Sequence, residues 1–346
     1  MDKPTISVVI PMFNAEGSIA RCLRSVQEQN VEDLEIICVD DGSTDRSAVI
    51  VEELAMKDPR VRLIRQENRS AGAARNTGMK YARGVYLHFL DADDTLCPGI
   101  YRRAAERLEQ TAAEVCVFQY RTRSGETGEE KAVPCLLNGR ERVTSLGREP
   151  AFFVYNMVAP WNKLYRRAWV EQNGFRFDEI PCGNDRGFYF RWLAVARSVC
   201  LLMDCGVCYQ VKNEAALTGS SRWRHLDSLL FAWRSAEQAM ADHPPAVRAM
   251  LTDCGMTDLL GVVRSAPEEH RGEVLEQLRR FFRETDLSVM DALPYPYTWR
   301  RVCEQIRDGG DDPQNEEKKL KNRMRHVAAS LRIWGLRGCI VKRRYR

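Results

Sequence analysis

Short apolar runs alternate along the first 120 residues with segments whose apolar residues recur at helical spacing. The runs are rich in Val, Ile and aromatic residues, which predicts strands, and they fall at residues 5–11, 34–40, 61–66, 85–90 and 114–120. The periodic segments predict helices at residues 18–29, 45–57, 71–82 and 99–110. Strands that alternate with helices in this way predict βαβ units, and therefore an α/β fold with a mostly parallel sheet flanked by helices.

Finer features of the pattern predict local structure. The run "LEIICVD" lacks polar alternation and is predicted to be buried on both faces. Asp45 is a candidate N-cap for the second helix. Residues 121–150 are turn-rich and charged, which indicates a hairpin or surface loop, whereas residues 222–307 are mainly helical in pattern. One helical face there is apolar throughout, through Val274, Leu275, Leu278, Phe281 and Phe282.

Three carboxylates within four residues follow the run at 85–90, namely Asp91, Asp93 and Asp94. Like charges this close raise the cost of ionising one another. Such a cluster is therefore either a solvated turn or a set of ligands for a cation. The loops after the other predicted strands add an aromatic ring, a carboxylate and a cation: Phe13, Asp41 and Arg75.

These loops are predicted to share one edge of the sheet, since ligands of parallel sheets bind beyond the carboxyl ends of the strands. An aromatic ring can stack on a base, and a carboxylate can accept from a base N–H or a ribose hydroxyl. A Mg²⁺ or Mn²⁺ ion held by Asp93 can bridge two phosphates. The pattern therefore indicates a site for a nucleoside diphosphate.

Four sequence motifs, in order, resemble the family 2 glycosyltransferases of bacterial polysaccharide and capsule synthesis: "ISVVIPMFNAEGSIARCLRSVQEQ", "VDDGSTD", "AGAARNTG" and "FLDADD". The resemblance is clearest over residues 5–110 and continues through "PWNKLYRR" and "FDEIPCGNDRGFYFRWL". It implies the GT-A fold, a nucleotide-sugar donor (a UDP-sugar before others), a glycan or polyprenyl-linked acceptor, Mg²⁺ or Mn²⁺, and inversion at the anomeric carbon.

The resemblance also assigns roles by position. Asp93 is the chief metal ligand, with Asp91 as the second. Asp41 contacts the base, Asp91 approaches the ribose, and Ala92 is the middle residue of the D-x-D motif. The donor-binding set comprises Pro11, Phe13, Asn14, Glu16, Asp41, Ser43, Arg75, Asp91 and Ala92.

An inverting transfer needs a base that takes the proton of the acceptor hydroxyl. Members of the family commonly carry Glu-Asp before an aromatic-rich helix, and this chain has Asn184-Asp185 there. Asp185 is therefore the expected base, and it can at the same time be the N-cap of the helix at 186–196. The neutral Asn184 alters how an acceptor is held. The alternative bases are Asp178 and Glu179. Trp161 either stacks on an acceptor sugar or belongs to the core.

The same residues give weaker support to other functions. A sugar-nucleotide nucleotidyltransferase would need a Gly-rich basic phosphate loop after the first strand, and "PMFNAEGS" lacks it. A non-catalytic binding or scaffold protein remains the alternative, with Asn184 as its sign. Twelve scattered cysteines predict buried, reduced thiols. Cys205-x-x-Cys208 lacks the second pair of ligands that a zinc site would need.

The net charge of +4 is concentrated near the carboxyl end, where residues 316–346 hold 11 Lys/Arg and 2 Glu. One helical stripe there is apolar: Leu320, Met324, Val327, Leu331 and Trp334. A basic amphipathic helix with a tryptophan favours an anionic membrane surface, although the stripe could instead pack on the protein itself. Nucleic acid is not expected, because aromatic residues do not alternate with the charges.

The sequence lacks an apolar run long enough to span a bilayer and lacks a signal-peptide pattern at its start. A cytoplasmic protein is therefore expected, peripheral on the inner face of the membrane. The expected division is a GT-A domain at 1–215, a helical region at 216–310, and a linker with the basic tail at 311–346.

Overall fold

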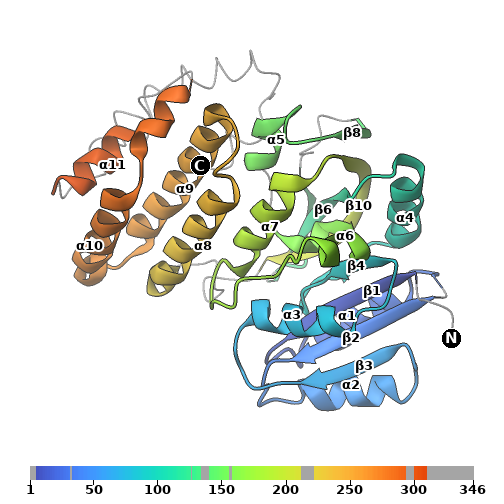
Figure 1. The fold of residues 1–346 in the computed structure, drawn as a ribbon. Coiled ribbons are helices and arrows are strands. Elements are labelled where there is room, and N and C mark those ends of the chain that lie inside the picture. Colours follow the sequence, from blue (N-terminus) through green and yellow to red (C-terminus); the bar gives the residue numbers. More distant parts are fainter. Residues whose placement is uncertain are drawn as a thin grey trace. The chain divides into compact units, whose positions relative to one another are not determined.

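The computed structural model describes residues 5–31, 33–125, 127–133, 140–155, 158–211, 222–293 and 300–309. The described residues pack into two units, coloured along the chain in Figure 1. The first unit takes its residues from Met1–Arg148 and Val158–Lys212, and the second from Glu149–Met157 and Asn213–Arg346. The predicted basic tail lies outside the described residues.

A ten-stranded sheet forms the centre of the first unit, with strand order β3-β2-β1-β4-β9-β6-β10-β5, β7 beside β6 and β8 beside β10. Its strands are β1 (Ile6–Met12), β2 (Leu34–Asp40), β3 (Val61–Arg65), β4 (Tyr86–Phe89), β5 (Thr95–Leu96), β6 (Val115–Ser124), β7 (Glu130–Ala132), β8 (Arg142–Thr144), β9 (Lys163–Arg166) and β10 (Val199–Val211). Every residue of β1 and β2 is buried, as predicted for "LEIICVD". The predicted hairpin within 121–150 is confirmed by the antiparallel pairing of β6 with β7.

Helices follow the strands at the predicted places, with ends shifted by a few residues. They are α1 (Ile19–Gln27), α2 (Ser47–Ala55), α3 (Ala71–Tyr81), α4 (Ile100–Thr111), α6 (Arg167–Gln172) and α7 (Asn184–Val195), with a short 3-10 turn η1 (Pro160–Asn162) before β9. The prediction that Asp45 caps the second helix is wrong, because α2 begins at Ser47 and Arg46 occupies the N-cap position. Asp45 instead accepts a hydrogen bond from the Ser47 N–H at 2.9 Å.

The predicted α/β fold is confirmed, and its mostly parallel sheet also contains antiparallel strands. Strands β3, β2, β1 and β4 run parallel to one another, and so do β6 and β10. Strand β9 lies antiparallel between β4 and β6. The alternation that predicted parallel strands ends near residue 120, so it could not predict the direction of β9.

Aromatic rings join β4 to helix α7. The Phe177 and Phe188 rings stack with centroids 4.0 Å apart and planes 8° apart. The edge of Phe89 contacts Phe177 at 4.8 Å, and Tyr165 meets Phe188 at 5.6 Å. Such pairs stabilise beyond the apolar area they bury, by about 0.5–1.5 kcal/mol each. Helix α7 is thereby held near the end of β4, where residues 91–94, the acidic turn, begin.

The second unit is helical. It contains α5 (Pro150–Val154), η2 (Arg222–His225), α8 (Leu226–Ala239), α9 (Pro245–Ser265), α10 (Glu268–Glu284), η3 (Leu287–Ala292) and α11 (Arg300–Arg307). Helices α8, α9 and α10 lie against one another in Figure 1. The predicted apolar face of α10 is confirmed, since all five of its residues are buried. Among the described residues, no helix has the length and apolar character that crossing a membrane requires.

Candidate active site

Four parallel strands deliver the predicted site residues to one edge of the sheet. The loops after β1, β2, β3 and β4 all lie at the same edge of the sheet, because these strands are parallel and their carboxyl ends meet there. Hydrogen bonds then join each loop to the next. The predicted residues of the amino-terminal motifs are thereby collected at a single edge.

The loops after β1 and β2 are joined by reciprocal hydrogen bonds. The Asn14 N–H donates to the Ser43 hydroxyl at 3.0 Å, and the Asn14 side-chain oxygen accepts from the Thr44 N–H at 2.9 Å. Glu16 accepts from the Arg46 N–H at 3.0 Å. Asn14 has φ +48°, a left-handed conformation that asparagine tolerates better than most residues. This arrangement leaves Phe13 50% exposed, with its ring available for stacking.

Asp41 is buried and holds the loop after β3. Its carboxylate accepts from Gln66 Nε2 at 2.7 Å, from the Arg69 N–H at 3.0 Å and from the Ser70 N–H at 2.9 Å. A carboxylate has about four acceptor positions, so one remains for a donor such as a base N–H. Asp41 is 4% exposed, and its first task in this structure is to order the loop that starts α3.

Arg75 connects the acidic turn to the start of α7. One guanidinium nitrogen donates to the Asp91 carboxylate at 2.6 Å, and another donates to the Asn184 side-chain oxygen at 2.7 Å. Its side chain is 6% exposed, and its guanidinium lies over the Phe177 ring at 5.2 Å. Charge-assisted bonds of this kind are about twice as strong as neutral ones. Arg75, which was expected to bind the donor, therefore positions two other site residues in this structure.

The approach of α3 to this segment depends on Gly72. A Cβ at position 72 would lie 2.1 Å from the Asp178 carbonyl oxygen and 3.0 Å from the Asn184 Cβ. One turn later, the Asn76 side chain pairs with both backbone groups of Phe177, at 2.9 and 2.8 Å. Helix α3 therefore fixes the whole segment that leads to Asp185.

The three carboxylates of the acidic turn differ in burial. Asp94 is fully buried and accepts from the Gln210 N–H of β10 at 2.8 Å, so it anchors the turn. Asp91 and Asp93 are partly exposed, and Ala92 between them is buried. The Asp93 carbonyl oxygen accepts from Arg21 at 3.2 Å, which fixes the backbone.

The two partly exposed carboxylates, Asp91 and Asp93, suit a divalent cation whose other ligands are phosphate oxygens. Among the described residues there is no group of three or more His, Cys, Asp or Glu side chains that could enclose a metal. Mg²⁺ is commonly held by one or two carboxylates together with substrate phosphates. The residues present therefore fit a metal that arrives with a diphosphate, with Asp93 and Asp91 as its protein ligands.

Three candidate bases differ in what surrounds them. Asp178 accepts from Arg191 at 2.9 Å, and Glu179 is bound by Arg69 and Asn76. Hydrogen bonding by Asn76 and Arg69 lowers the pKa of Glu179. Asp185 lies in the first turn of α7, after Gly183 as N-cap, so the N-cap alternative for it is wrong. Within the described part of the chain, no side chain donates a hydrogen bond to its carboxylate, so Asp185 is the most available base of the three.

Trp161 is 3% exposed. Its ring stacks on Tyr209 at 5.2 Å with planes 14° apart, and its edge meets Tyr120 at 4.9 Å. His88 Nε2 lies 2.8 Å from the Trp161 carbonyl oxygen, which can only accept, so this nitrogen donates and fixes the turn. Burial favours the core role of Trp161 over stacking on a sugar. Tyr209, which the sequence did not single out, has its pKa raised to about 12 by burial and by the nearby acidic turn.

Comparison with known proteins identifies the family. The family model described as Glycosyl transferase family 2 matches residues 7–174. Succinoglycan biosynthesis protein ExoO of Rhizobium meliloti (strain 1021) is 30% identical over 247 residues, 66% of this chain and 67% of ExoO. The chain belongs to glycosyl transferase family 2. The uncharacterized glycosyltransferase EpsJ of Bacillus subtilis (strain 168) is 34% identical over 226 residues, which are 62% of this chain. The alignments span 63% of EpsJ and 58% of the putative glycosyltransferase EpsH of the same organism.

Solved structures establish the fold of this family 2 chain. S. aureus TarS 1-349 in complex with UDP matches with a TM-score of 0.73 and 19% identity, over 93% of this chain and 92% of TarS 1-349. The same protein in complex with UDP-GlcNAc matches equally, with a TM-score of 0.73. The GT-A fold expected from the motifs is therefore present.

Lys163 is a buried cation beneath the expected base of this family 2 site. The residue is 2% exposed, and its ammonium donates to the Ala159 carbonyl and to the Asn162 side chain, both at 2.7 Å. It lies 5.2 Å from the centre of the Tyr189 ring. Asp185 and Tyr189 are four residues apart on α7 and share a face, so Lys163 is close to the face that carries Asp185. Burial lowers the pKa of Lys163 to about 7, and the charge of Asp185 partly opposes this shift.

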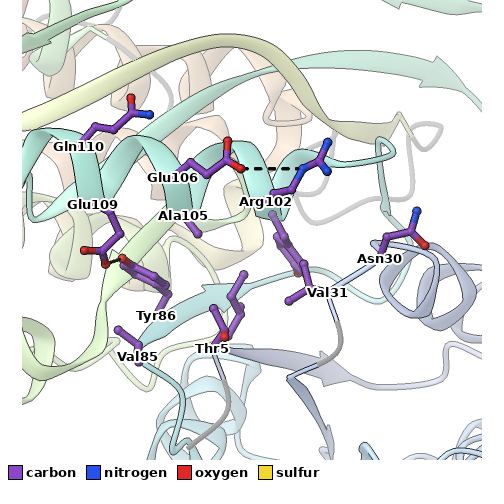
Figure 2. Close-up of a pocket in the computed structure, with 12 residues that line it drawn as sticks. Thr5, Asn30, Val31, Val85, Tyr86, Arg102, Ala105, Glu106, Glu109 and Gln110 are labelled. Carbon is purple, nitrogen blue, oxygen red and sulfur yellow. Dashed lines mark hydrogen bonds and ion pairs between the residues drawn. The ribbon is translucent and has the colours of Figure 1, made fainter.

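A separate cavity of about 600 Å³ opens at the opposite edge of the sheet, where β1 and β4 begin (Figure 2). The exposed area of its lining is mainly apolar, and each of its three charged side chains has a partner. Glu109 accepts from the Tyr86 hydroxyl, and Arg102 lies 4.0 Å from Glu106. None of the predicted site residues lines this cavity.

Lys163 gives a prediction for stability against pH. The pKa of an unfolded lysine is about 10.4, whereas burial lowers the pKa of Lys163 in the fold to about 7. Between these values the unfolded state binds one more proton, so this group makes the free energy of unfolding rise with pH, by about 1.4 kcal/mol per unit. Urea denaturation across this range should show that Lys163→Met loses the slope. The control Lys80→Met, at an exposed position, should keep it. Equal slopes in wild type and Lys163→Met would contradict the assignment.

Proposed function

We propose that this chain is a metal-dependent, inverting glycosyltransferase that moves a sugar from a nucleoside-diphosphate sugar to a hydroxyl of a glycan or polyprenyl-linked acceptor. The observation that carries the proposal is the Arg75 bridge. It joins Asp91, in the turn proposed to hold the metal, to Asn184, the neighbour of the proposed base. The bridge supports the proposal because it holds the two groups that the reaction needs at the same edge of the sheet.

Relatives support the choice of substrates. TarS structures are described with UDP and UDP-GlcNAc, which favours a UDP-sugar donor here. ExoO is described as a protein of succinoglycan biosynthesis, which favours a role in the synthesis of a cell-surface polysaccharide.

In the proposed reaction each residue acts on a stated group. Phe13 stacks on the base, and the remaining acceptor position of Asp41 takes a base N–H. Asp93 and Asp91 would hold Mg²⁺ or Mn²⁺, which would supply positive charge to stabilise the departing diphosphate. Asp185 takes the proton of the acceptor hydroxyl as that oxygen attacks the anomeric carbon from the face opposite the diphosphate. Arg75 keeps Asp91 and the start of α7 in place throughout.

The metal ligand can be tested by binding alone. Asp93→Ala removes the proposed chief ligand from a partly exposed turn, so the fold should survive. Calorimetry with UDP and Mn²⁺ should show at least about a tenfold loss of affinity, since even indirect changes around a metal cost this much. EDTA should abolish the difference between the variant and wild type. Glu52→Ala, which removes an exposed carboxylate on α2, is the control for charge and should bind as wild type does. Unchanged binding by Asp93→Ala would exclude this ligand.

The base can be tested by turnover. A panel of nucleotide sugars with Mn²⁺, UDP-GlcNAc among them, identifies a donor from the release of its nucleotide. Asp185→Asn should then lower transfer by on the order of 10²-fold or more, with donor affinity little changed. Full transfer by this variant would direct the search to Asp178 or Glu179. If wild type binds a donor but turns over none of the nucleotide sugars in the panel, the result would favour the scaffold alternative.

We also propose that the basic tail holds the protein on the inner face of the membrane, near a lipid-linked acceptor. Each Lys or Arg near an anionic surface contributes about 1 kcal/mol, attenuated by salt. Full-length protein should sediment at low salt with vesicles of phosphatidylglycerol and phosphatidylcholine, and a protein ending at Asn315 should not. Vesicles of phosphatidylcholine alone are the control. Equal sedimentation of both proteins would indicate a tail that packs on the protein itself.

A further inference from the structure

Three cysteines gather where β5 meets β10, and together they form the thiol cluster: Cys97, Cys205 and Cys208. The Cys97 and Cys205 sulfurs lie 3.4 Å apart, with the Cys97 thiol donating to Cys205. Cys208 lies near Glu130, with 3.7 Å between its sulfur and Glu130 Oε1. The Cys205-x-x-Cys208 spacing stood out in the sequence, yet the close partner of Cys205 is Cys97, 108 residues away.

An irregularity in β10 brings these two sulfurs together. The pairing of β10 with β6 shifts register between Leu202 and Cys205, and again between Cys205 and Val207. Bulges of this kind re-aim a side chain. Gly206 is required inside the bulge, because a Cβ there would lie 2.2 Å from the Phe118 ring. The Gly206 carbonyl in turn accepts from the Cys97 N–H at 2.8 Å, which holds Cys97 opposite the bulge.

Cys205 has the properties of an attacking thiol. Among the ten described cysteines it is the only one that is not buried. The hydrogen bond from Cys97, aided by the charge of Arg121, lowers the pKa of Cys205, and the same bond raises the pKa of Cys97. Thiolate character and access together make a cysteine reactive.

A second thiol pair in the same sheet, Cys116 and Cys200, is an internal control for the reactivity of Cys97 and Cys205. Cys116 and Cys200 are register partners on β6 and β10 and are hydrogen-bonded to each other. Both are completely buried. The two pairs therefore differ in access while sharing strand β10.

We propose that Cys205 and Cys97 form a site of thiol–disulfide exchange with low-molecular-weight disulfides. The Cys205 thiolate attacks one sulfur of the small disulfide, forms a mixed disulfide and releases one small thiolate. Cys97 gives up its proton, attacks the Cys205 sulfur and releases the second small thiolate. The two protein thiols are oxidised by two electrons, the small disulfide is reduced to two thiols, and the two protons end on those thiols.

The geometry permits the second step without a change of fold. The sulfurs must close from 3.4 Å to a bond of about 2.05 Å, which side-chain rotation can provide. The bond would tie Cys97 to the strand whose Gln210 N–H anchors Asp94. The exchange does not depend on the proposed transferase activity.

Oxidised glutathione is the probe for this site. The folded, full-length protein is incubated with it, free thiols are blocked with N-ethylmaleimide, and digested peptides are identified by mass spectrometry. We expect one cross-linked peptide pair, Cys97 with Cys205, lighter by two hydrogen atoms and restored by dithiothreitol. Cys116 and Cys200 should remain thiols over the same period.

Single substitutions separate the steps. Cys97→Ser should stop the reaction at the glutathione adduct of Cys205, whereas Cys208→Ser should still form the cross-link. Cys205→Ser should give neither product, with circular dichroism reporting that it is folded. A Cys205–Cys208 bond, an unmodified Cys205, or equal oxidation of the Cys116 and Cys200 pair would overturn the proposal.

Discussion

The site depends on one buried cation that has two partners far from it in sequence. Arg75 cannot lose its charge in a protein, and its burial is tolerated because Asp91 balances it and Asn184 satisfies another of its nitrogens. Removing one partner of a buried pair costs several kcal/mol, because the other charge is left uncompensated. The acidic turn and the start of α7 are therefore held in register by the same side chain.

Around Arg75 the structure separates support from chemistry. Asp41 and Asp94 are buried and hold loops, while Asp91 and Asp93 keep exposed area at the same edge. The reciprocal hydrogen bonds between Asn14 and the loop of Ser43 order the loops after β1 and β2, and Asp41 orders the loop after β3. A site ordered in this way before its ligand arrives has less conformational entropy to lose on binding.

Much of this could be predicted from local sequence, and the reasons for the failures are physical. Strand and helix periodicity located the elements of the first 120 residues, and four motifs at strand ends located the candidate site. Direction of pairing is not a local property, so the antiparallel β9 was missed. Burial of Trp161 depends on Tyr209 and Tyr120, which come from other strands.

Long-range contacts explain the remaining gaps. The partners of Arg75 are 16 and 109 residues away, and nothing in the local pattern around Arg75 names them. The nearness of Cys97 to Cys205 depends on a bulge that periodicity does not encode. Asp45 has the chemistry of an N-cap, but the helix starts two residues later and uses it differently.

Gly72 limits how this site can change over evolutionary time. Its missing side chain leaves room for the Asp178 carbonyl, so any substitution must displace the segment between α6 and α7 that leads to Asp185. A single substitution of Gly72 would therefore move that segment, unless a second substitution in the segment made room for the new side chain. The sequences of helix α3 and of the segment at 178–185 must therefore fit each other, and chimeras between homologues should keep both from one parent.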